Sequence, residues 1–256
     1  MPSQIQDFSR LHSMKIYNST IFEWNAAAAL TNTHHPVFSG FVAVRVNMSN
    51  AQLPPGLMSS DFPQSLGSIE FIETNLASLP ENLDSSWPVG MVLGFESCQF
   101  SQLPPVLLRV APSQLSFAGN LFTTFPFEAF AIPGLIYLNF DSNPIATLRP
   151  EPYRNVGIGS VRDLYPMDTT ISSLPRWIDR LFQLVDEYEP LQFHNTPFCD
   201  DVLEIQHGGQ SGFPATETPE TELSVVMKDM VMLGSSVSCV YYEVDYPLAL
   251  EDTWHT

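Results

Sequence analysis

The sequence predicts an α/β solenoid, in which short coils stack side by side and form a parallel β-sheet on one face, opposite irregular or short helical connections. Three observations support this prediction. An apolar pattern recurs at a nearly constant spacing, a turn-forming residue follows each predicted strand, and a proline-containing return follows most of the turns. Because one such coil cannot bury its own apolar face, the stability of the chain must come from stacking neighbouring coils.

The clearest repeat unit covers residues 135–148 and reads L-x-x-L-x-F-x-x-N-x-I-x-x-L. An asparagine side chain satisfies backbone groups in a turn, and Ser, Thr and Cys often replace it. Residues at this asparagine position recur 25, 24, 22, 23 and 26 positions apart, and they are Ser49, Thr74, Cys98, Asn120, Asn143 and Thr169. An ordinary α/β domain would need longer helical patterns between its strands than these proline-rich connections contain.

Each unit predicts a short strand whose alternate residues point into the stack and away from it. We expect parallel strands at 66–72, 93–96, 115–118, 138–141 and 164–167. The outward residues form the concave face, which is the natural binding surface of such a solenoid, and exposed aromatic residues there are the usual anchors. The candidate partner-binding residues, a basic cluster with Lys15 followed by an acidic and aromatic cluster, are Tyr17, Arg45, Glu70, Ile72, Glu96, Tyr137, Asn139, Asp141, Tyr165 and Met167.

Charge limits the choice of partner. The chain has 10 basic and 28 acidic residues, for a net charge of -18, and such a field repels nucleic acids and anionic lipid surfaces. The acidic cluster predicts a basic protein or peptide partner, and a glycan is a further candidate. Half of the acidic residues, 14, lie in residues 183–256 beside a single basic residue. We therefore predict a solenoid with its closing segment over residues 1–200 and an acidic, partly flexible extension over 201–256.

The repeat units resemble those of the leucine-rich-repeat superfamily. The segments 174–181 (L-P-R-W-I-D-R-L) and 193–199 (F-H-N-T-P-F-C) are similar to the closing segments of repeat proteins predicted from oomycete genomes. The resemblance covers residues 11–200 and implies an exported or membrane-displayed recognition domain. The first residues lack the pattern of a signal peptide, and no stretch is apolar enough to span a bilayer. We expect the protein outside the cell or at its surface if the chain is part of an exported protein, and in the cytoplasm otherwise.

The three cysteines, Cys98, Cys199 and Cys239, lack the spacing of a zinc site. One disulfide with one buried thiol would fit an exported protein, whereas three free thiols would fit a cytosolic protein. Cys199 and Cys239 are the candidates for pairing, although the sequence does not fix this, and Cys98 is expected to be a structural thiol. Asn18 and Asn47 begin N-x-S/T sequons, which would carry glycans only in an exported protein.

Support for catalysis is confined to one short segment. His207 and Ser211 lie in a glycine-rich stretch that resembles an esterase loop, but Phe213 breaks the G-x-S-x-G pattern. We expect a non-catalytic binding module without cofactor or metal. The alternatives are a hydrolase that uses His207 and Ser211, and a fragment of a larger repeat-containing receptor or receptor kinase. The apolar stretch 223–242 is expected to cap the end of the solenoid.

Overall fold

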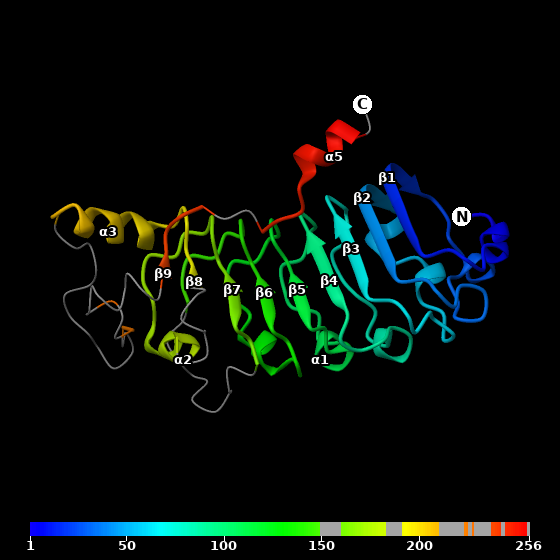
Figure 1. Cartoon of the computed structure of the whole chain (residues 1–256), viewed down its shortest axis with the longest axis horizontal. Coiled ribbons are helices and arrows are strands. Elements are labelled where there is room, and N and C mark those ends of the chain that lie inside the picture. The colour runs from blue at the N-terminus through cyan, green and yellow to red at the C-terminus, as the bar shows by residue number, and fades with distance from the viewer. Residues whose placement is uncertain are drawn as a thin grey trace.

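The computed structural model describes residues 1–148, 160–182, 191–209, 223–224, 227, 237–241 and 244–254. Seven parallel strands form one sheet in chain order, and a smaller two-stranded parallel sheet follows them (Figure 1). The strands are β1 (Ser13–Ile21), β2 (Gly40–Met48), β3 (Ser68–Ile72), β4 (Val92–Glu96), β5 (Gln114–Ser116), β6 (Tyr137–Asn139), β7 (Asp163–Tyr165), β8 (Leu191–Gln192) and β9 (Val237–Ser238). The predicted α/β solenoid with a parallel sheet is confirmed.

The side of the solenoid opposite the sheet consists of short helices and irregular segments. Pro54, Pro126 and Pro175, which end predicted returns, each directly precede a 3-10 helix. Proline fixes its own φ and prevents a long helix from passing through it. The α-helices among the described residues, not all of which lie on that side, are α1 (Leu107–Val110), α2 (Asp179–Phe182), α3 (Pro197–Gln206) and α5 (Leu248–Trp254). The 3-10 helices are Ser3–Asp7, Ala26–Ala28, Ser49–Ala51, Pro55–Leu57, Leu83–Ser85, Phe127–Ala131 and Arg176–Ile178.

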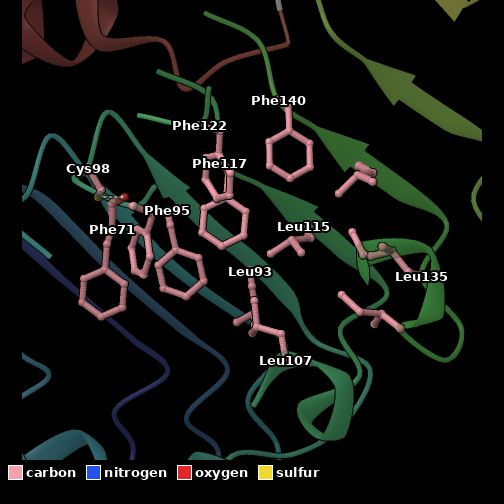
Figure 2. Close-up of a cluster of buried hydrophobic side chains, with 14 of the residues drawn as sticks. Phe71, Leu93, Phe95, Cys98, Leu107, Leu115, Phe117, Phe122, Leu135 and Phe140 are labelled. Atoms are coloured by element: carbon pink, nitrogen blue, oxygen red, sulfur yellow. Dashed lines mark hydrogen bonds between the residues drawn. The ribbon is translucent and has the colours of Figure 1, made fainter. Parts of the chain in front are cut away.

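Two inward rows of side chains run through the stacked coils and form the core. Phe71, Phe95, Phe117 and Phe140 make one row, with ring centroids 5.9, 5.4 and 5.8 Å apart along it (Figure 2). All four side chains are fully buried, so each aromatic ring packs mainly on the corresponding ring of the next coil. The second row, also buried, consists of Phe41, Ile69, Leu93, Leu115, Leu138 and Leu164.

The residue at the asparagine position joins its coil to the coil before it at Cys98, Asn120 and Asn143. Asn143 Nδ2 donates to the carbonyl oxygen of Phe117 in the preceding coil at 2.9 Å, and its Oδ1 accepts from the Phe122 N–H at 3.1 Å. Cys98 occupies the same position, where its Sγ donates to the carbonyl of Phe71 at 3.4 Å. Burial raises the pKa of the Cys98 thiol to about 11, so this cysteine stays protonated and serves as a hydrogen-bonding spacer.

One residue with a left-handed backbone directly precedes this position in every coil of the seven-stranded sheet. These residues are Asn18, Arg45, Glu73, Ser97, Gly119, Ser142 and Asp168. In the second coil the left-handed residue is Arg45, so Val46 stands at the asparagine position and the assignment of Ser49 to it is wrong. The prediction placed the turn at the end of the strand, but β2, like β1, continues past its left-handed residue, whereas β3 to β7 are shorter.

The end of the solenoid is covered by residues that follow α3. Leu223 forms a bridge with Pro175, and the buried sulfur of Met227 accepts a hydrogen bond from the Leu174 N–H. Strand β9 pairs with β8 and so adds a last rung beyond β7. Leu223, Met227 and β9, from the predicted capping stretch, therefore pack on the last coils. Within the described ranges, none of the helices is long and apolar enough to cross a membrane.

Candidate functional site

The outward side chains of the sheet form rows across the concave face, and the strand register defines them. The middle row consists of Lys15, Val42, Glu70, Gly94, Ser116, Asn139 and Tyr165. The edge row lies two residues further along each coil and consists of Tyr17, Val44, Ile72, Glu96, Ala118, Asp141 and Met167. Eight of the ten candidate residues lie in these two rows, and Tyr137 lies beside them. Arg45 is the left-handed residue within β2 and lies in neither row.

The candidate residues divide into two groups by burial. Tyr17, Arg45, Glu70, Tyr137 and Tyr165 are half-buried and reach the surface. The other five are at most 8% exposed, so their side chains are covered in this structure, and their contact with a partner stays a prediction. These five are Ile72, Glu96, Asn139, Asp141 and Met167. Their neighbours in adjacent coils cover them in part, and so does a segment that the sequence did not connect with this face.

The C-terminal residues 244–254 lie on the concave face. Asn139 Nδ2, from β6, donates to Asp245 Oδ1 at 3.1 Å. The Tyr246 N–H donates to Glu96 Oε2, from β4, at 2.6 Å. Figure 1 shows this red end of the chain returning from β9 across the sheet towards its N-terminal strands. The chain therefore crosses its own strands in the reverse of their order.

The returning segment reaches as far as β1. Lys15 Nζ forms an ion pair with Glu251, and it also lies 5.7 Å from the centroid of the Tyr246 ring. The Tyr246 hydroxyl donates to Glu251 at 2.5 Å, so the carboxylate accepts from two sides. Desolvation lowers the pKa of Lys15, but the hydrogen bonds to Glu251 and Tyr246 outweigh it and the pKa is raised. Lys15 is therefore a positively charged contact at this end of the face.

Burial changes the charge of the acidic residues on the face. Burial raises the pKa of Glu96 to about 7, although hydrogen bonds from Ser116 and Tyr246 oppose the shift. Burial, with repulsion from Asp245, raises the pKa of Asp141 to about 9. At pH 7 Asp141 is thus neutral and Glu96 is about half ionised. The concave face carries less negative charge than its acidic residues imply.

Asp141 is the most confined of these carboxyl groups. Its Oδ1 accepts from the Met167 N–H at 2.6 Å, whereas its Oδ2 has no hydrogen-bond partner within the described part of the chain. A protonated Oδ2 avoids the cost of a buried charge. The neutral form of Asp141 therefore follows from geometry as well as from its pKa.

A pair of tyrosines lies on β6 and β7, and a cavity lies beside it. The rings of Tyr137 and Tyr165 lie with their centroids 5.0 Å apart and their planes at 37°. Burial raises the pKa of Tyr137, so its hydroxyl remains a hydrogen-bond donor. A cavity of about 180 Å³ lies next to Tyr137, between the sheet and the returning segment, and its walls include Glu70, Gly94 and Val244. The segment leaves unfilled space here.

Arg45 and Tyr17 meet at the edge of the sheet. Arg45 Nε pairs with Glu73 Oε2 at 2.5 Å, and Nη1 donates to the Tyr17 hydroxyl at 3.3 Å. Together with Asn47, Arg45 and Glu73 line an open polar groove of about 490 Å³. Asn47 lies in β2, beyond the left-handed Arg45. The side chains of Asn47 and Asn18 are both exposed.

The remaining candidates lie away from this face. Cys199 and Cys239 form a disulfide with Cα atoms 5.6 Å apart, which is the pairing that the sequence left open. His207 is exposed at the C-terminal end of α3, and Ser211 lies outside the described residues. Among the residues that the structure describes, there is no group of three His, Cys, Asp or Glu side chains that could hold a metal ion.

Comparisons with known proteins leave the function open. No protein-family model matches the chain, and no curated protein matches it. Among solved structures, the chain is similar to YopM, described as a leucine-rich effector protein from Yersinia pestis, at 21% identity and a TM-score of 0.38. The match covers 77% of this chain and 55% of YopM, so the chain spans about half the length of that protein. The solenoid architecture described above depends on the strands and their register, not on this likeness.

Proposed function

We propose that this chain is a non-catalytic recognition module that binds a protein or peptide through the concave face of its sheet. One observation carries the proposal: the face holds a non-helical stretch of polypeptide, residues 244–247, through the side chains of Asn139 and Glu96. A surface that binds one peptide by side chains from a rigid sheet has the chemistry to bind another. The half-buried tyrosine pair supplies anchors of the kind that dominate binding energies.

A capture experiment with the full chain as bait identifies candidate partners. Titration of each purified candidate against the chain then tests the proposal. We expect the Tyr137→Ala/Tyr165→Ala variant to bind the partner roughly tenfold or more weakly. Leu121→Ala, at a residue that is 54% exposed and outside the rows, is the matched control and should bind like the unchanged chain. Equal affinity in the double variant and the control would reject the concave face as the binding surface.

This proposal makes no statement about the charge of the partner. The expectation of a basic partner counted Glu96 and Asp141 as exposed negative charges, and both are buried. A glycan partner stays a prediction, as does a hydrolase that uses His207 and Ser211. No contact of His207 within the described residues favours the hydrolase over binding.

Export from the cell is the location that we propose. The disulfide between Cys199 and Cys239 fits an oxidising compartment, and the exposed side chains of Asn18 and Asn47 are accessible for glycosylation. The resemblance to oomycete repeat proteins implies the same location. Mass spectrometry of the native protein tests this: an intact disulfide and glycans at both asparagines would support export, and reduced, unmodified protein would count against it.

A further inference from the structure

The returning segment is held to the concave face by contacts that a separate peptide could make. Asp245 accepts from Asn139, the Tyr246 N–H donates to Glu96, and Glu251 pairs with Lys15. The contact of Tyr246 with Glu96 is made by the backbone, and tyrosine is favoured at this position by its ring, whose centroid lies 5.7 Å from Lys15 Nζ. The three groups of the segment lie within seven residues, so a short linear peptide carries all of them.

The same segment contributes little to the apolar core. Among its residues whose side chains are described, the only buried one is Glu251, and Leu250 is 55% exposed. Segments with few buried apolar contacts open at a lower free energy than the core does. The segment can therefore leave the face while the stacked coils remain folded.

From these two features we propose that the concave face recognises a linear peptide with a defined motif, and that residues 244–254 are an internal copy of this ligand. In the motif an acidic residue is followed directly by a tyrosine, and a second acidic residue lies five positions after the tyrosine. The inference rests on the function proposed above and names the class of its partner. A partner peptide competes with the segment for Asn139, Glu96 and Lys15. The raised pKa values of Glu96 and Asp141 support the proposal, because these carboxyl groups then repel an acidic peptide less than ionised ones would.

The cavity next to Tyr137 adds a preference at one position of the peptide. Val244 forms part of its wall but leaves about 180 Å³ open, beside Glu70 and Gly94. A larger apolar side chain at the place of Val244 would bury more surface there. A peptide with leucine at this place should bind roughly fourfold more tightly, as expected for one further buried methylene.

Titration of a labelled peptide with the sequence of residues 244–254 against the full chain tests the proposal. In the unchanged chain the internal segment competes at a high effective concentration, so binding should be weak. A tail variant, Asp245→Ala/Tyr246→Ala/Glu251→Ala, keeps the face intact, and it should bind the peptide roughly tenfold or more tightly than the unchanged chain. A peptide of the same composition in scrambled order is the control and should not bind.

Exchanging the charges of Lys15 and Glu251 shows that a loss of binding does not come from misfolding, because a misfolded chain would not recover binding with the altered peptide. In the tail variant, Lys15→Glu should abolish binding of the peptide, and a peptide that carries Glu251→Lys should restore it. Lys15 has an exposed side chain, so its replacement leaves the core unchanged. Equal binding of the peptide to the tail variant and the unchanged chain, or no rescue by the exchanged charge, would overturn the proposal.

The two experiments distinguish a failure of this inference from a failure of the proposed function. Suppose that a captured partner loses affinity for the Tyr137→Ala/Tyr165→Ala variant but does not compete with the peptide. Then the face is a binding surface and the inference about its ligand is wrong. If the double variant also binds normally, the proposed function itself fails.

Discussion

The two faces of the same strands are stabilised by different kinds of contact. On the inner face, Phe95, Phe117 and Phe140 stack on partners from the adjacent coils, about one repeat away in the sequence. On the outer face, Asn139 and Glu96 bind residues that lie 106 and 150 positions further along the chain. The comparison teaches that the repeat determines the core, whereas a segment outside the repeat determines how open the concave face is.

Removing one ring from the aromatic row should have the largest effect. Phe117 is fully buried between Phe95 and Phe140, so Phe117→Ala leaves a cavity and should lower the free energy of unfolding by about 4 kcal/mol. Urea titration measures the change. Leu121→Ala is the control, with an expected effect within about 0.5 kcal/mol. Similar losses in the two variants would show that the row does not determine stability.

Removing the disulfide should have the next largest effect, and it should act near the last coils. The bond joins residues 40 positions apart, and Cys239→Ser should lower the free energy of unfolding by about 3 kcal/mol. Thermal unfolding with and without a reducing agent measures this. Because Cys98 is not paired, the reducing agent should have no further effect on the variant. A further loss on reduction would contradict the pairing.

The outer face should make stability depend on pH. The folded-state pKa values of Glu96 and Asp141 are raised, so the folded chain binds more protons at these sites than the unfolded chain does. Their contribution to stability is therefore largest at acidic pH, and it falls as the pH rises from about 5 through about 9. Urea midpoints across this range measure it. Glu96→Gln should make the urea midpoint depend less on pH in the lower part of this range. An unchanged pH dependence would exclude Glu96 as its source.

Removing the charge of Lys15 should have the smallest effect on global stability. The Lys15 side chain is 35% exposed, and such ion pairs contribute about 0.5 kcal/mol. We expect Lys15→Met to leave the urea midpoint almost unchanged but to speed amide hydrogen exchange in α5, which Lys15 holds through Glu251. Unchanged exchange in α5 would show that the ion pair does not hold the segment on the face.

The sequence predicted the inner face well because its rules are local. Alternation within a strand and a turn residue at a regular spacing fix which side chains point inwards, and Leu138 and Phe140 are fully buried as expected. The asparagine position was assigned wrongly in the second coil, where β2 extends past the left-handed residue Arg45. No local pattern marks a strand that continues beyond the turn.

The outer face was predicted less well because its contacts are not periodic. Glu96 and Asn139 lie in β4 and β6 as expected and Asp141 lies just beyond β6, but Asp245 and Tyr246 contact the side chains of Asn139 and Glu96. Asp245 and Tyr246 belong to an acidic region without repeats. A lysine facing an acidic tail was the only available signal, and electrostatic complementarity alone does not specify a register.

The return of the chain onto its first strand has a consequence for biosynthesis. Proteins leave the ribosome from the N-terminus, so all the strands of the seven-stranded sheet are made before residues 244–254. A nascent solenoid therefore has an uncovered sheet surface for the time that translation takes to reach the tail. A ligand or chaperone present at that moment meets this surface before the chain itself can occupy it.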